Sequence, residues 1–244
     1  MSQTDDAEAM DRVSVEIHHQ HRDVSGGWLR PTVFGMMDGL VSNFALIAGV
    51  AGASASRTSI TLAGIAGLVG GAFSMATGEY ISVQSQNEST RAEVEVERRE
   101  LRVNFDAEVS ELAQTYVARG VDPDLAQRVS EQLSRDPDQA LLVHAREELG
   151  VDPDSLPGPW TAAFSSLLSF TVGAVIPLLP YLFGATSIVF SAVVALAALF
   201  AAGAITTRFT SRSWLFSGTR QLLLGAIAAA VTFGVGGLFG TVVG

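Results

Sequence analysis

An uncharged stretch of 48 residues, from Trp160 to Thr207, constrains this chain more than any other feature. As a single α-helix it would be about 72 Å long, whereas the hydrocarbon core of a bilayer is about 30 Å thick. The stretch must therefore form two membrane spans. Turn-forming residues stand near its middle, in Pro180-Tyr-Leu-Phe-Gly184, so we expect the break there.

Three further apolar runs are each long enough for one membrane span, which needs about 20 residues. Asp38 is the only charged residue in the first run, and Glu79 is the only one in the second. The runs are Thr32–Ala53, Ile60–Ser82 and Leu222–Gly244. The sequence thus predicts an all-α, polytopic membrane protein with five transmembrane helices.

The charged residues divide the chain into four parts. These are a polar N-terminal tail (1–30), spans one and two (31–85), an acidic helical insert (86–159) and spans three to five (160–244). We expect three helices in the insert. The first should run from about Gln86 to Arg119, because it contains no glycine or proline. The others should begin at Asp122-Pro123 and Asp136-Pro137, where an aspartate cap precedes a proline at the first helical position.

The distribution of arginine predicts the orientation in the membrane. All 15 basic residues are arginine, and counting the loops alternately puts every one except Arg57 on the same side. Basic residues favour the cytosolic side, so the tail and the insert should be cytosolic and the C-terminus outside.

Nothing in the sequence resembles eukaryotic targeting, which favours a bacterial plasma membrane. The chain has no cysteine, which excludes disulfides and thiolate chemistry, and its net charge of −10 gives no reason to expect a nucleic-acid partner.

Asp38 and Glu79 are candidate metal ligands within the membrane. Acidic residues in membrane spans usually face a polar interior or an ion pathway. Each lies near the cytosolic end of its span, so the two carboxylates should meet at a similar depth. Met75 precedes Glu79 by four residues and shares its helix face. Carboxylates with a thioether suit a first-row transition metal better than Mg²⁺ or Ca²⁺, although a protonated acid bonding a neighbouring helix remains the alternative.

The insert contains a second set of candidate ligands. On a continuous helix, five glutamates would form a stripe about 80° wide, in which like charges destabilise the helix unless a cation binds. The stripe consists of Glu93, Glu97, Glu100, Glu108 and Glu111. Further along, His144 and Glu148 share a helix face, with Glu147 beside them. Imidazole with carboxylates suits iron, manganese or zinc, so the insert could also hold Zn²⁺; an ordinary solvated charged helix is the alternative. The cluster His18, His19 and His21 in the tail favours a polar segment over a metal site.

Three motifs together carry a family resemblance. They are Phe34-Gly-Met-Met-Asp38-Gly-Leu-Val-Ser-Asn43, Ala72-Phe-Ser-Met75-Ala-Thr-Gly-Glu79-Tyr80 and Ile176-Pro-Leu-Leu-Pro180-Tyr, with the acidic insert between the last two. From Arg22 to its C-terminus, the chain resembles the vacuolar iron transporter family of iron and manganese exporters. The resemblance implies a homodimer with the ion path near span one, and proton-coupled export of Fe²⁺ or Mn²⁺ collected by the insert.

The resemblance also assigns residues. Asp38 and Met75 match the membrane metal site, and the insert glutamates of the family match Glu97, Glu100, Glu108, Glu111 and Glu148. His144 stands where plant relatives carry methionine. Gly67 stands where plant relatives carry a carboxylate in span two, and we expect Glu79, about three turns further on, to take over that role.

Two other classes of function fit part of the sequence. A membrane-anchored metal sensor or store would bind metal at the insert without moving it across the membrane. An intramembrane hydrolase would need a nucleophile and a base at membrane depth, and no histidine lies in a span. Two intramembrane acids could serve an aspartyl protease, but that would leave the glutamate stripe without a purpose. The sequence therefore favours a transporter over an enzyme.

Overall fold

The computed structural model describes residues 27–209 and 212–243, and all regular structure within these ranges is helical. Five of the helices are long and apolar enough to cross a membrane, in agreement with the expected number. They are α2 (Leu29–Gly52), α3 (Arg57–Val103), α7 (Pro159–Leu182), α8 (Ile188–Thr206) and α9 (Trp214–Val243), with a 3-10 turn, η2, at Thr207–Phe209. The expected break is confirmed: α7 ends just before Gly184, whose φ is +103°.

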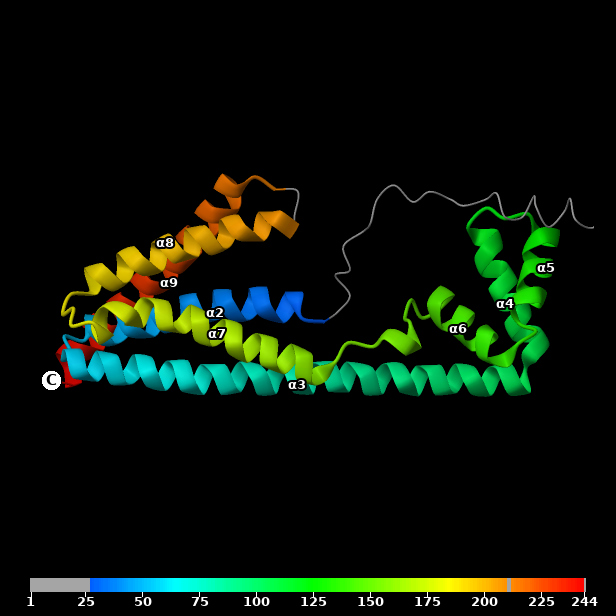
Figure 1. The fold of residues 1–244 in the computed structure, drawn as a ribbon, viewed down its shortest axis with the longest axis horizontal. Helices are drawn as coiled ribbons and strands as arrows, with labels where there is room; N and C mark the ends of the chain where they lie inside the picture. The colour runs from blue at the N-terminus through cyan, green and yellow to red at the C-terminus, as the bar shows by residue number, and fades with distance from the viewer. Residues whose placement is uncertain (1–26, 210–211, 244) are drawn as a thin grey trace, which may run out of the picture.

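The long helix α3 organises the molecule. Figure 1 shows it running from the group of long helices at one end to the short helices of the insert at the other. Its 47 residues correspond to a length of about 70 Å, so only its first half can lie within a bilayer. Span two and the start of the insert are therefore one continuous helix.

Helix α7 packs against both α2 and α3, and glycines allow its close approach to α2. A Cβ at Gly39 would meet the backbone carbonyl of Phe170 and the backbone nitrogen of Ala174. From the other side, a Cβ at Gly173 would meet the backbone of Met36 and Leu40. Small residues let membrane helices pack backbone to backbone, and here they fix how α2 and α7 align.

Gly39→Ala should destabilise the helix bundle by about 1–3 kcal/mol, because its methyl group would collide with backbone atoms that cannot move aside. Gly234→Ala is the matched control, since open space surrounds that position of α9. Thermal unfolding in detergent should show a lower midpoint for Gly39→Ala alone. Equal midpoints for the two variants would contradict the described α2–α7 contact.

The first helix of the insert differs from expectation. The prediction of one helix from Gln86 to Arg119 is wrong, because α3 ends at Val103 and a separate helix, α4 (Phe105–Ala118), follows. At the junction, Asn104 has φ −125° and ψ 36°, outside the helical region. Its Nδ2 donates to the Glu100 carboxylate at 2.6 Å, while its carbonyl accepts the first bonds of α4. Asparagine thus caps the end of one helix and begins the next.

The remaining insert helices begin where the aspartate–proline pairs predict. Asp122 caps α5 (Pro123–Leu133), and Asp136 caps α6 (Pro137–Glu147) by accepting from two backbone N–H groups at 2.9 Å. A 3-10 turn, η1 (Pro153–Ser155), leads back to α7. Helix α6 lies along the end of α3 (Figure 1), where Val94, Leu141 and Ala145 form a small apolar core. This core brings the polar face of α6 to that of α3.

Candidate metal centre

Four side chains converge where α3, α4 and α6 meet. They are Glu97 from α3, Glu108 from α4, His144 from α6 and Glu148 just after α6, and we call them the insert cluster. One ligand atom from each lies within 4.8 Å of the others. The break at Asn104 creates this arrangement, because it lets Glu108 face Glu97 from a second helix instead of following it along one helix.

The insert cluster is buried and its polar atoms lack ordinary partners. His144 Nδ1 lies 3.0 Å from both Glu97 Oε1 and Glu148 Oε1, and it lies 3.9 Å from Glu108 Oε2. The His144 side chain is fully buried, and the three carboxylates are only 10–16% exposed. Both ring nitrogens, Glu97 Oε1 and Glu148 Oε1 make no hydrogen bond within the described residues. Buried polar atoms that point at one another without bonding are costly unless a cation joins them.

The electrostatics of the insert cluster favour a bound cation. Burial and the neighbouring Glu148 charge raise the pKa of Glu97 to about 7, against a smaller opposing effect of His144. Burial, Glu111 and Glu108 raise the pKa of Glu148 to about 7 as well. Burial and Glu111 also raise the pKa of Glu108. The folded chain thus holds protons that the unfolded chain would release, so these carboxyl groups stabilise the insert less as pH rises from about 4.5 to 7.

The other insert residues predicted as ligands lie around the cluster. Glu100 accepts a hydrogen bond from Asn104, and exposed Glu111 acts on the cluster through its charge. Glu147 instead forms an ion pair with Arg119 of α4. The structure therefore separates Glu147 from its neighbour Glu148. The tail residues His18, His19 and His21 lie outside the described residues.

Adjacent Glu147 and Glu148 provide a matched pair for testing the insert cluster. Glu148→Gln should weaken binding of Mn²⁺ or Zn²⁺ to the insert by about tenfold or more, because it removes a charged ligand. Glu147→Gln should leave the affinity within about twofold, since that carboxylate pairs with Arg119. Calorimetric titration of the two variants measures both values. Equal losses of metal affinity in the two variants would show that the overall negative charge attracts the metal, and that it does not bind at this cluster.

A second candidate site lies among the long helices. Asp38 of α2 and Met75 of α3 line the same cavity of about 250 Å³. Its remaining lining comprises Ser42, Asn43, Leu46, Gly67, Gly71, Ser74 and Phe170. The Asp38 carboxylate makes no hydrogen bond or ion pair with any described residue, and Ser42 instead donates to the Asp38 backbone carbonyl at 2.5 Å. Asp38 also lines a wider hollow of about 530 Å³ bounded by α2 and α9.

Glu79 does not meet Asp38 at the same depth, so that expectation is wrong. Helices α2 and α3 align where Gly67 approaches Asn43 and where Gly64 approaches Ile47. This register places Glu79 roughly seven residues, or about 10 Å, nearer the insert than Asp38. Counting from the ends of the apolar runs misses this offset, because it ignores how the two helices pack. Buried Glu79 places its Oε2 instead 3.9 Å from Nη1 of Arg30, and this oxygen makes no hydrogen bond with any described residue.

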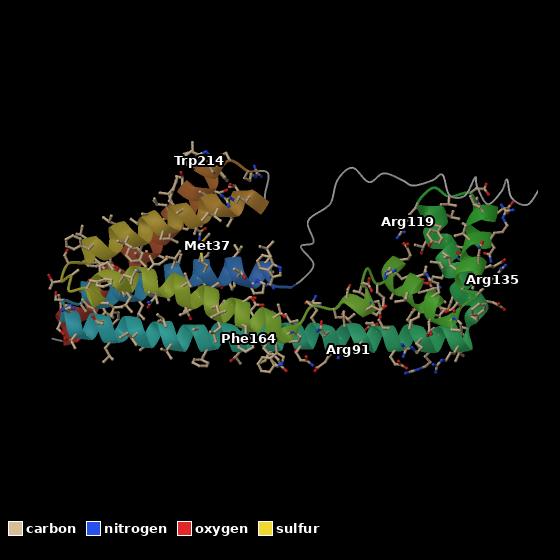
Figure 2. The ribbon with its side chains drawn as sticks, in the orientation of Figure 1. Met37, Arg91, Arg119, Arg135, Phe164 and Trp214 are labelled. Carbon is tan, nitrogen blue, oxygen red and sulfur yellow. The ribbon has the colours of Figure 1, made fainter. Side chains whose placement is uncertain are left out.

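Asn43 also lines the Asp38 cavity, although no role was expected for it. The signal that could have singled it out is an amide side chain within a mainly apolar membrane span. The cavity lies among the long helices and the insert cluster near the C-terminal end of α3, about 33 Å apart along that helix. Figure 2 labels Met37, the neighbour of Asp38, among the long helices and Arg119, the partner of Glu147, at the far end.

Comparison with known proteins assigns nearly the whole chain to one family. A model of the VIT family matches residues 29–237. Vacuolar iron transporter 1 of rice is 32% identical over 234 residues, covering 92% of each chain. The vacuolar iron transporter of Acanthamoeba castellanii is 38% identical over 224 residues, covering 89% of this chain and 81% of that protein. Vacuolar iron transporter 1 of Arabidopsis thaliana is 31% identical over 220 residues, or 88% of each chain.

The family match runs from the first turn of α2 into α9 and so includes both candidate sites. It confirms the resemblance that the motifs around Asp38 and Met75 indicate. The chain belongs to the VIT family, a family of transporters and not of enzymes.

Proposed function

We propose that this protein exports Fe²⁺ or Mn²⁺ from the cytosol in exchange for protons. The observation that carries the proposal is that α3 supplies a ligand to each of two metal-competent sites. Glu97 joins the insert cluster near one end of this helix, and Met75 lines the Asp38 cavity about 33 Å away along it. Metal would bind first at the insert and then reach Asp38 and Met75.

The donor atoms suit these ions. One imidazole and three carboxylates in the insert cluster match the preferences of Fe²⁺, Mn²⁺ and Zn²⁺, so the insert should also bind Zn²⁺. A carboxylate and a thioether in the membrane cavity favour a transition metal over Mg²⁺ or Ca²⁺. The names of the relatives support iron as the transported ion.

Protons and metal compete for the same atoms, which supplies a means of coupling. A carboxylate must lose its proton to bind a metal ion, so protonation releases the metal. Asp38 is the carboxylate in the cavity and is free of other partners among the described residues. Glu79, buried beside Arg30, would lie on the path between insert and cavity and give a second proton-binding group.

Orientation, assembly and location form part of the same proposal. The excess of arginine on the insert side supports a cytosolic insert and an outward release of metal. A homodimer would close the wide hollow beside Asp38, which the single chain leaves open to its surroundings. The sequence favours a bacterial plasma membrane, but the relatives, named vacuolar transporters of plants and an amoeba, lend that location no support.

Metal flux into or out of proteoliposomes tests the proposal. With Fe²⁺ or Mn²⁺ on one side and an imposed pH gradient, we expect uptake that collapses when an ionophore removes the gradient. Internal pH should change with metal movement. Metal binding without any flux would overturn the transporter and leave the alternative of a membrane-anchored sensor or store.

A further inference from the structure

We infer that Asn43 supplies a neutral oxygen ligand to the transported ion at the deep end of the Asp38 cavity. The inference rests on the proposed function, since it concerns the same ion path. Asn43 lies five residues beyond Asp38 on α2, or about 7 Å further from the insert. Both residues line the one cavity of about 250 Å³.

The hydrogen bonding of Asn43 leaves its oxygen available. The side chain is only 2% exposed, and its Nδ2 donates to the Ala174 carbonyl of α7 at 2.6 Å. A carbonyl oxygen can only accept, so this bond fixes which end of the amide faces α7. The Oδ1 atom therefore points elsewhere, and it is buried without a partner among the described residues. Buried amide oxygens are nearly always bonded, so an orphan that borders a cavity indicates a ligand.

The neighbour of this oxygen is Gly67 on α3. A Cβ built at Gly67 would lie 2.8 Å from Asn43 Oδ1, and both residues border the cavity. The Leu46 Cδ2 methyl group and the Asn43 amide oxygen thus occupy the space into which a side chain at position 67 would extend. The oxygen that Asn43 supplies there is neutral.

A neutral oxygen ligand determines how protons compete with the ion. An amide oxygen does not titrate, so protons cannot compete with metal at the deep end of the cavity. Met75 does not titrate there either. Among the residues that line this cavity, only Asp38 can exchange a proton for the metal.

The alternative is a purely structural amide that ties α2 to α7. Three variants separate the two roles: Asn43→Ala, Asn43→Asp and the double variant Asn43→Ala/Gly67→Glu. Alanine removes both the oxygen and the α7 bond. Aspartate keeps an oxygen but loses the donor to Ala174. The double variant restores a carboxylate oxygen from α3 without restoring that donor.

The experiment measures Mn²⁺ flux in proteoliposomes against Mn²⁺ concentration and pH. Asn43→Ala should raise KM by about tenfold or more, as loss of a metal-site contact does. Asn43→Asp and the double variant should recover most of the affinity and acquire a new pH dependence from the added carboxyl group. Thr232→Val is the matched control, because it removes a comparable bond from α9 to the Ala45 carbonyl of α2 outside the cavity. Its KM should stay within about twofold.

Each outcome decides the inference. If Asn43→Asp or the double variant recovers the affinity for Mn²⁺, the Asn43 oxygen is supported as a metal ligand, because neither variant restores the bond to Ala174. A KM for Asn43→Ala that matches native protein overturns the inference and leaves the proposed function standing. Loss of flux in Asn43→Ala with no recovery in either other variant also overturns it, in favour of the structural role. Absence of flux from the native chain would instead remove the proposed function itself.

Discussion

Asp38→Asn should reduce proton-driven metal flux to about one hundredth of the native rate or less, while the protein still folds. Asp38 is the only acidic side chain that lines the cavity shared with Met75, and no described residue neutralises or bonds its carboxylate. Asparagine has nearly the same shape but carries no charge and binds no proton. The variant should therefore lose both the main ligand of the cavity and the exchange of proton for metal.

Proteoliposome flux of Mn²⁺ or Fe²⁺ measures this effect, and Glu88→Gln is its matched control. Glu88 is an exposed carboxylate of the same helix as Met75, and it bonds only to Gln84 among the described residues. Its removal should leave the rate within about twofold of native. Zn²⁺ binding at the insert should remain intact in Asp38→Asn, which would show that the variant is folded. Native flux in Asp38→Asn would rule the cavity out as the ion path.

The affinity of the insert cluster for metal should fall about 100-fold between pH 8 and pH 6. Glu97 and Glu148 each have a pKa raised to about 7, so both are mostly ionised at pH 8 and mostly protonated at pH 6. Each must release its proton before it binds a metal ion. Two such groups each contribute about tenfold over this range, and the direction is weaker binding at lower pH.

Calorimetric titration with Mn²⁺ or Zn²⁺ in the Asp38→Asn background isolates the insert from the membrane cavity. The Glu148→Gln variant should show a shallower pH dependence, because one of the two titrating ligands is gone. Carboxylates with ordinary pKa values would add nothing to the pH dependence in this range, so Glu148→Gln would then leave its slope unchanged. An unchanged slope would contradict the raised pKa of a buried, convergent cluster.

Most helices of the fold could be predicted because their signals are local. The length of the apolar runs predicts the five long helices, Gly184 marks the turn after α7, and Asp122 and Asp136 cap their helices as expected. Each of these depends on a few neighbouring residues. None of these signals depends on which other helices pack against the segment.

The sites could be predicted only in part, because they depend on packing between helices. The residue types of the insert cluster were evident, but a single helix carrying both Glu97 and Glu108 was the wrong geometry. The helical period continues through Asn104, so the sequence pattern conceals the break there. The depth of Glu79 depends on the register of α2 and α3, which the glycine contacts at Gly64 and Gly67 set. No pattern within one helix reveals it.

Because α3 is one continuous helix, a tilt at its membrane end would move its insert end. A continuous helix transmits a tilt along its axis, and Glu97 lies about 33 Å beyond Met75. A tilt of about 5° around Met75 therefore displaces Glu97 by about 3 Å, which is comparable to the spacing of the atoms in the insert cluster. In the proposed function, metal binding at the insert and rearrangement of the membrane cavity would thus be mechanically linked. A flexible linker at residue 86 would have separated these two events.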